Sequence, residues 1–150
     1  SMEVKKILCA VDLEDTIAPS VEYAKMMASM TGASILVAYV IPAHTPYEDV
    51  YLSVNNQPNE VNNPNETIQK SMNALLAEQF AGMDATGVIL VGRPSEELVK
   101  LAEEKGANLI VMGTHGRAGF DRLLFGSVAH EVVRAAPCPV MTVRPLMPKK

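Results

Sequence analysis

Short continuous runs of apolar residues alternate along the chain with segments in which apolar residues recur every three or four positions. A strand buried on both faces reads as a continuous apolar run, whereas one face of a helix repeats with a period of 3.6. The runs predict five strands, at residues 7–11, 35–41, 88–91, 109–112 and 140–143. Since helical segments fill the gaps, we expect an α/β fold, with a single doubly wound domain, a parallel sheet and four helices on its two faces.

Residues that typically begin or end a helix bound the four periodic segments. The third helix is the best marked, from Pro94 to Lys105, with Gly106 behind it. The first should end at Gly32, and the second should lie between an N-cap at Asn65 and a stop at Gly82. The apolar face of the first helix consists of Ile17, Val21, Ala24 and Ala28. The fourth is expected over residues 127–135, with Val128, Val132 and Ala136 buried.

Residues 42–64 break this alternation with five asparagines and four prolines, and a further asparagine, Asn65, follows directly. A stretch of this length without periodicity is uncommon inside a compact domain. It is either a surface insertion or a lid or partner contact beside a ligand, because it leaves the carboxyl end of the second strand, where ligands bind in such sheets. Both interpretations stay open. The fifth strand follows Pro137 and Pro139, which predicts a strand at the edge of the sheet.

The composition narrows the function classes. A chain of 150 residues with 48% hydrophobic and 20% charged residues is typical of one globular domain. Its net charge of −4 argues against general binding of nucleic acid, and no apolar run reaches the ~20 residues of a membrane span. The run after Lys5 and Lys6 is too short for a secretion signal, so we expect a cytoplasmic protein. Cys9 and Cys138 fit a reducing compartment and are too few for a metal site.

The main candidate for a binding site follows the fourth strand. Gly113 and Gly116 lie there, and Gly126-Ser127 comes ten residues after Gly116. Glycines let backbone N–H groups approach an anion, and a helix start adds free N–H donors. Arg117 and Arg122 supply positive charge, so the loop predicts a phosphate site; a simple flexible turn is the alternative. Neither the G-x-G-x-x-G fingerprint after a first strand nor a Walker loop with its lysine is present.

Asp12 follows the first strand and is the second candidate. Its carboxylate could cap a helix, although Asp15 or Thr16 would do so better, or it could accept hydrogen bonds from an adenine amine or a ribose hydroxyl. An acidic cluster here is also found in receiver domains, which need an aspartate after the third strand and a lysine after the fifth. This chain has Arg93 and Arg144 near those places, which counts against a receiver.

Four segments together resemble the universal stress protein family. They are Lys6–Asp12, Leu109–Arg117, Phe125–Ala129 and Ala136–Val140. The resemblance spans nearly the whole chain and implies one nucleotide-binding domain over residues 2–146, with strand order 3-2-1-4-5. That order places Asp12 and Gly113 on opposite sides of the crevice between strands 1 and 4, where the order reverses and ligands bind.

The retained glycines further resemble the ATP-binding branch of the family. By that resemblance Asp12 and Val40 contact adenine and ribose, Met112 lines the pocket, and the phosphates bind to residues of the loop and last helix together with Mg²⁺. The implied site consists of Ala10, Val11, Asp12, Val40, Met112, Gly113, Thr114, Gly116, Arg117, Gly126, Ser127 and Val128. Thr114, Ser127 and Val128 are the implied phosphate donors.

The resemblance also implies a homodimer through the fifth strand, at Val140, Met141, Thr142 and Val143. Two residues depart from the family pattern: Ala10 stands where proline is frequent and Leu13 where glycine is frequent.

Three functions follow from these observations. The leading hypothesis is a cytoplasmic stress-response module that signals by binding ATP or AMP. The second is a slow ATPase or self-phosphorylating enzyme that uses Ser127 or Thr114, with His115 or Asp12 as the base. The third is a dimeric interaction protein that binds no nucleotide. No catalytic residue or metal ligand is assigned.

Overall fold

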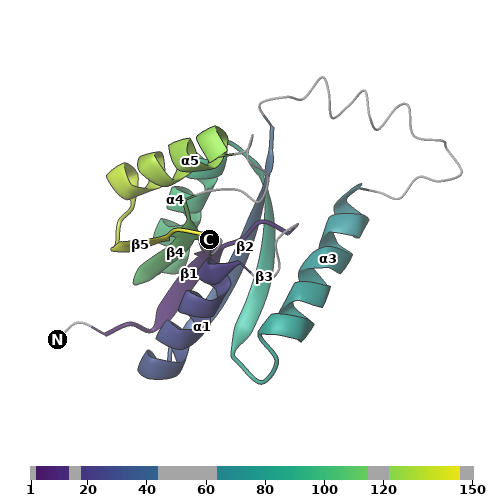
Figure 1. Ribbon diagram of the computed structural model, residues 1–150, viewed down its shortest axis with the longest axis vertical. Coiled ribbons are helices and arrows are strands. Elements are labelled where there is room, and N and C mark those ends of the chain that lie inside the picture. Colours follow the sequence, from purple (N-terminus) through teal and green to yellow (C-terminus); the bar gives the residue numbers. More distant parts are fainter. Residues whose placement is uncertain (1–2, 14–17, 44–63, 115–121, 146–150) are drawn as a thin grey trace, which may run out of the picture.

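The computed structural model describes residues 3–13, 18–43, 64–114 and 122–145, without the side chains of residues 64–65 and 122–125. Parallel strands form one sheet in the order β3-β2-β1-β4-β5, as Figure 1 shows. The strands are β1 (Lys6–Ala10), β2 (Ser34–Pro42), β3 (Ala85–Gly92), β4 (Leu109–Gly113) and β5 (Val140–Val143). The predicted doubly wound fold, its strand order and the edge position of the fifth strand are therefore confirmed.

Four helices of the described chain cover the two faces of the sheet (Figure 1). They are α1 (Pro19–Thr31), α3 (Pro64–Gln79), α4 (Pro94–Lys105) and α5 (Arg122–Ala135). The buried side chains of α1 and α3 belong to one apolar layer, and those of α4 and α5 belong to another. None of the described helices is long and apolar enough to cross a membrane.

The central strand β1 explains the continuous apolar runs. Ile7 and Cys9 point into the layer under α1 and α3, whereas Leu8 and Ala10 point into the layer under α4 and α5. Successive side chains of a strand alternate between faces, so a strand covered on both faces needs an apolar residue at every position. The two apolar layers hold the sheet rigid beneath its carboxyl edge.

Glycine and proline residues predict the observed helix ends better than polar N-cap residues do. Gly32 and Gly106 end α1 and α4 in the left-handed conformation, with φ of 76° and 67°. The N-cap of α1 is Ala18, without a side-chain hydrogen bond, and Pro19 stands at the first helical position. The predicted N-cap at Asn65 is wrong, because α3 already begins at Pro64. Proline at this position fixes φ and lacks the N–H group that a cap would satisfy.

Candidate functional site

The strand register brings three predicted site residues level at the carboxyl edge of the sheet. Cys9 pairs with Val111 in β4, and Ala10 pairs with Ala38 in β2. Continued past the end of β1, this register places Asp12 level with Thr114 on one side and Val40 on the other. The half-buried carboxylate of Asp12 thus lies at the point where the strand order reverses.

Buried side chains form a floor beneath this edge. Ala10, Val40 and Met112 all face α4 and α5, with exposed fractions of 6%, 8% and 0%. Val11 is also buried, in the layer on the opposite face. Because Met112 is fully enclosed, it supports the edge from the core.

Thr114 ties the end of β4 to the neighbouring edge strand. Its backbone N–H donates to the carbonyl oxygen of Val143 at 3.0 Å, and its hydroxyl donates to the same oxygen at 3.4 Å. Both donor groups of Thr114 are therefore directed at the same oxygen, and the residue holds the ends of β4 and β5 together.

Gly126 brings helix α5 close to the same place. A Cβ atom built on Gly126 would lie 3.6 Å from the carbonyl oxygen of Thr114, the one contact of this kind that the described residues make within 4 Å. The structure thus joins two predicted site residues that are twelve positions apart in the sequence. The missing side chain leaves a small space between the helix and the end of β4.

Helix α5 begins at Arg122, five residues before the predicted start at Ser127. The expectation that Gly126-Ser127 opens the helix is therefore wrong. Nothing in the sequence from Arg122 to Phe125 breaks a helix, and a single glycine inside one is tolerated at a cost of about 1 kcal/mol.

The earlier start changes what the end of the predicted loop can offer a ligand. The backbone N–H groups of Ser127 and Val128 lie in the second turn, where they donate to carbonyl groups of the helix itself. Ser127 is exposed, so its hydroxyl is its available donor. Gly116, Arg117 and His115 lie outside the described residues, as do Asp15, Thr16, Ile17 and most of the insertion.

The two cysteines take no part in this edge. Cys9 is completely enclosed, and burial raises the pKa of its thiol to about 12. Burial also raises the pKa of Cys138, which is half-buried. Within the described ranges, no group of three or more His, Cys, Asp or Glu side chains could hold a metal ion.

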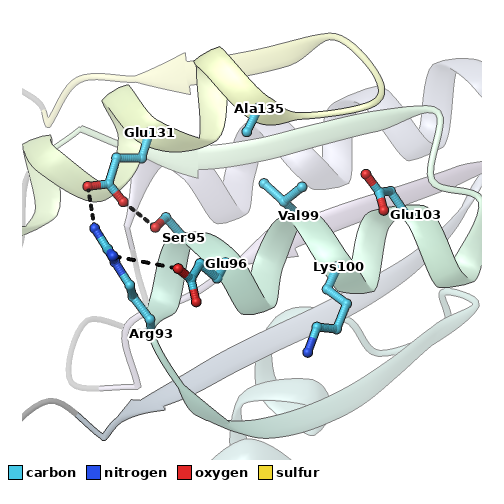
Figure 2. A pocket seen from close by; sticks show the side chains of 8 residues that line it. All are labelled: Arg93, Ser95, Glu96, Val99, Lys100, Glu103, Glu131 and Ala135. Atoms are coloured by element: carbon cyan, nitrogen blue, oxygen red, sulfur yellow. Dashed lines mark hydrogen bonds and ion pairs between the residues drawn. The ribbon is translucent and has the colours of Figure 1, made fainter.

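A polar cluster between α4 and α5 escaped the sequence analysis. A groove of about 410 Å³ separates the two helices, and Figure 2 shows Glu131 of α5 reaching across it toward the start of α4. Ser95 donates a hydrogen bond to Glu131, and Arg93 Nη2 lies 3.2 Å from Glu131 Oε1. These bonds lower the pKa of Glu131, the Ser95 hydroxyl more than the Arg93 charge. Glu131 and Ser95 are 36 positions apart, so no local pattern could have linked them.

Comparison with known proteins places this fold in a family. The model of the Universal stress protein family matches residues 3–144. The chain belongs to the universal stress protein family.

Individual relatives extend over the same length. "Universal stress protein MJ0577" of Methanocaldococcus jannaschii is 28% identical over 157 residues, covering 96% of this chain and 97% of the relative. "Universal stress protein MJ0531" of the same organism is 33% identical over 150 residues, covering 97% and 84%. A universal stress protein of Thermus aquaticus is 33% identical over 148 residues, covering 93% and 98%.

Solved structures agree with the fold. The structure of MJ0577 superposes with a TM-score of 0.73 at 26% identity, covering 98% of this chain and all of the other. A universal stress protein in complex with cAMP gives a TM-score of 0.68 at 22% identity, covering 95% and 98%. One from Archaeoglobus fulgidus in complex with dAMP gives 0.56 at 23% identity, covering 94% and 98%. At these identities the last two likenesses concern the fold alone.

Proposed function

We propose that this chain binds an adenine nucleotide, ATP or AMP, at the carboxyl ends of β1 and β4, and that nucleotide occupancy is the signal of a cytoplasmic stress-response module. The observation that carries the proposal is the register of β1 with β2 and β4, which, continued past Ala10, brings Asp12 level with Val40 and Thr114 at the reversal of strand order, where Gly126 faces Thr114. Universal stress proteins of the same fold are known in complex with cAMP and with dAMP, which supports an adenine ligand.

The adenosine half would lie on the β1 and β2 side of the edge. The Asp12 carboxylate would accept hydrogen bonds from the adenine amine or the ribose hydroxyls, which are neutral donors. Val40 and Ala10, which line the buried floor, would set the depth of the base, with Val11 and Met112 supporting them.

The phosphates would lie on the β4 and α5 side, together with Mg²⁺. The hydroxyls of Thr114 and Ser127 are the polar groups that the described chain offers there, and the space beside Gly126 gives a phosphate room to approach. Gly113, Gly116, Arg117 and Val128 complete the proposed site. Each hydrogen bond to a charged phosphate oxygen contributes about 1.5–3 kcal/mol.

The first test is binding of ATP, AMP and adenosine, measured by calorimetry and by thermal unfolding, with and without Mg²⁺. Ligand at a hundredfold excess over Kd should stabilise the fold by about 2.7 kcal/mol. Asp12→Ala should weaken all three ligands, whereas Ser127→Ala should weaken ATP and leave adenosine unchanged. Binding of none of the three would refute the proposal.

Matched controls lie elsewhere in the chain. Asp84 is an exposed aspartate at the amino end of β3, and Ser71 is an exposed serine inside α3. Asp84→Ala and Ser71→Ala should bind all three ligands like the wild type. Equal losses in the site variants and in the controls would point to general instability and would contradict the assignment of these residues to the site.

A further inference from the structure

The contact between α4 and α5 is built around one buried hydroxyl. Ser95 is only 5% exposed, and its hydroxyl donates to the carboxylate of Glu131 on the other helix. Arg93 reaches the same carboxylate from the turn before α4, and it also pairs with Glu96 at 3.5 Å. Figure 2 shows the three side chains meeting at one end of the groove. We call Arg93, Ser95 and Glu131 the helix clamp.

Both basic side chains that line the groove are paired with carboxylates of the protein. Arg93 is shared by Glu131 and Glu96, and Lys100 lies 3.5 Å from Glu97. A receptor for a charged ligand would present groups that await a partner. The paired arrangement favours a mechanical function, in which Glu131 fixes the position of α5 on α4.

The helix clamp acts on the same helix as the proposed phosphate contacts. Glu131 follows Ser127 by four residues, so the two lie one turn apart on one face of α5. Gly126, next to Ser127, faces the carbonyl oxygen of Thr114. Any sliding of α5 along α4 would therefore change the spacing between α5 and the end of β4.

The other side of the helix clamp is anchored at the carboxyl edge of the sheet. Arg93 directly follows Gly92, the last residue of β3, and the carbonyl oxygen of Gly92 accepts the N–H of Ala43 at 3.1 Å. The guanidinium group thus starts from a turn that is itself tied to the end of β2. Glu131 is held against a fixed point of the sheet, which makes it a suitable positioning group for α5.

We propose that Glu131 is a positioning residue for the phosphate side of the nucleotide site, because it holds Gly126 and Ser127 at the spacing from Thr114 that a polyphosphate requires. This inference rests on the proposed function. It predicts a difference between two ligands: substitution of Glu131 should change the affinity for ATP but not the affinity for adenosine, which binds on the β1 and β2 side.

The experiment compares Glu131→Ala with Glu131→Gln, using ATP and adenosine as separate probes in calorimetry. Glu131→Ala should weaken ATP by roughly tenfold, the scale of one well-placed hydrogen bond, and should leave adenosine unchanged. Glu131→Gln keeps an oxygen that can accept the Ser95 hydrogen bond, so it should restore most of the ATP affinity. Glu103→Ala, an exposed carboxylate that lines the same groove from α4, is the matched control and should bind like the wild type.

The possible outcomes distinguish a failure of the positioning role from a failure of the proposed nucleotide-binding function. A wild type that binds neither probe would refute the proposed function, and the positioning role with it. A wild type that binds both, with Glu131→Ala weakening ATP and adenosine equally or not at all, would overturn the positioning role alone. Hydrogen exchange of the nucleotide-free protein adds a second readout: the amides of residues 126–128 should exchange faster in Glu131→Ala than in Glu103→Ala, and equal rates would also overturn it.

Discussion

Gly126 lies inside a helix, where glycine is a poor choice for stability. Alanine in the interior of a helix is more stable than glycine by about 0.5–1 kcal/mol. The new Cβ atom would lie 3.6 Å from the carbonyl oxygen of Thr114, which is an ordinary contact. We therefore expect Gly126→Ala to raise the free energy of unfolding by about that amount in urea titrations without nucleotide.

The same methyl group would occupy the space proposed for a phosphate. We expect Gly126→Ala to lower ATP affinity while adenosine still binds, so that stability and binding move in opposite directions. Ser71→Ala, in the interior of α3, is the control for an added helix-forming residue. A destabilised Gly126→Ala protein would show that α5 lies closer to β4 than described, and unchanged ATP affinity would count against Gly126 as part of the site.

At the scale of elements, the packing of α3 on β3 depends on another glycine. A Cβ atom on Gly87 would lie 2.6 Å from Cγ and 2.9 Å from Sδ of Met72, whose side chain is fully enclosed. Gly87→Ala should therefore destabilise the protein by about 1–3 kcal/mol, the usual cost of overpacking.

The double variant tests whether this contact is the cause. Met72→Ala alone should cost about 2–5 kcal/mol, but in its background Gly87→Ala should cost much less than in the wild type, because the two closest atoms are gone and only Leu76 Cδ1, at 3.1 Å, stays near the new Cβ. Urea unfolding of the four proteins completes the cycle. Additive losses would show that Gly87→Ala does not act through its contact with Met72.

The helix clamp gives α5 a dependence on pH. Its hydrogen bond and ion pair lower the pKa of Glu131 in the folded state, so they stabilise the fold above the unfolded pKa of about 4.3 and are lost as the pH falls through the folded value. Glu131→Gln should be less stable than the wild type at neutral pH, and thermal unfolding should show the difference shrinking in acid. Ser95→Ala removes the main cause of the lowered pKa and should move this loss to higher pH. A difference that stays constant with pH would contradict the lowered pKa.

The elements also show what the sequence could and could not predict. All five strands were expected, because each is a continuous apolar run, although only the inner strands β1, β2 and β4 are largely buried, and the edge position of β5 followed from Pro137 and Pro139. The start of α5 was missed, since Gly126 was taken for a helix boundary although it lies inside the helix and faces the carbonyl oxygen of Thr114. That proximity is tertiary, so spacing alone cannot reveal it.

One part of the candidate site could likewise be predicted from the sequence, and another part could not. Asp12 could be placed beside Gly113 because the family resemblance implied the strand order and strand ends meet at one edge. The helix clamp could not be found, because Arg93 and Ser95 lie at the start of α4 whereas Glu131 lies on α5, and each one taken alone looks like an ordinary polar residue of a helix start or an exposed face.

At the scale of the whole molecule, the sheet has two edges, β3 and β5, and the proposed homodimer uses the second. Along β5, Pro139 and Val143 turn their carbonyl groups toward β4, where they accept from Ile110 and Thr114, both at 3.0 Å. Backbone groups alternate in direction along a strand. Val140 and Thr142 therefore turn their N–H and carbonyl groups to the open edge, where a second copy could pair.

Thr142→Pro removes one outward N–H group without touching the bonds to β4, and its side chain is exposed. If two copies pair through β5, this variant should be monomeric at concentrations where the wild type sediments as a dimer, with a nearly unchanged fold by circular dichroism. Val91→Pro is the matched control, because Val91 is exposed on the other edge strand, β3. The carbonyl oxygens of Asp84 and Gly92 accept from the N–H groups of Ile35 in β2 and of Ala43 just after it. Even-numbered residues of β3 therefore bond to β2, and the backbone groups of odd-numbered residues such as Val91 face the open edge. A dimer that survives Thr142→Pro but dissociates in Val91→Pro would move the interface from β5 to β3, the other edge of the sheet.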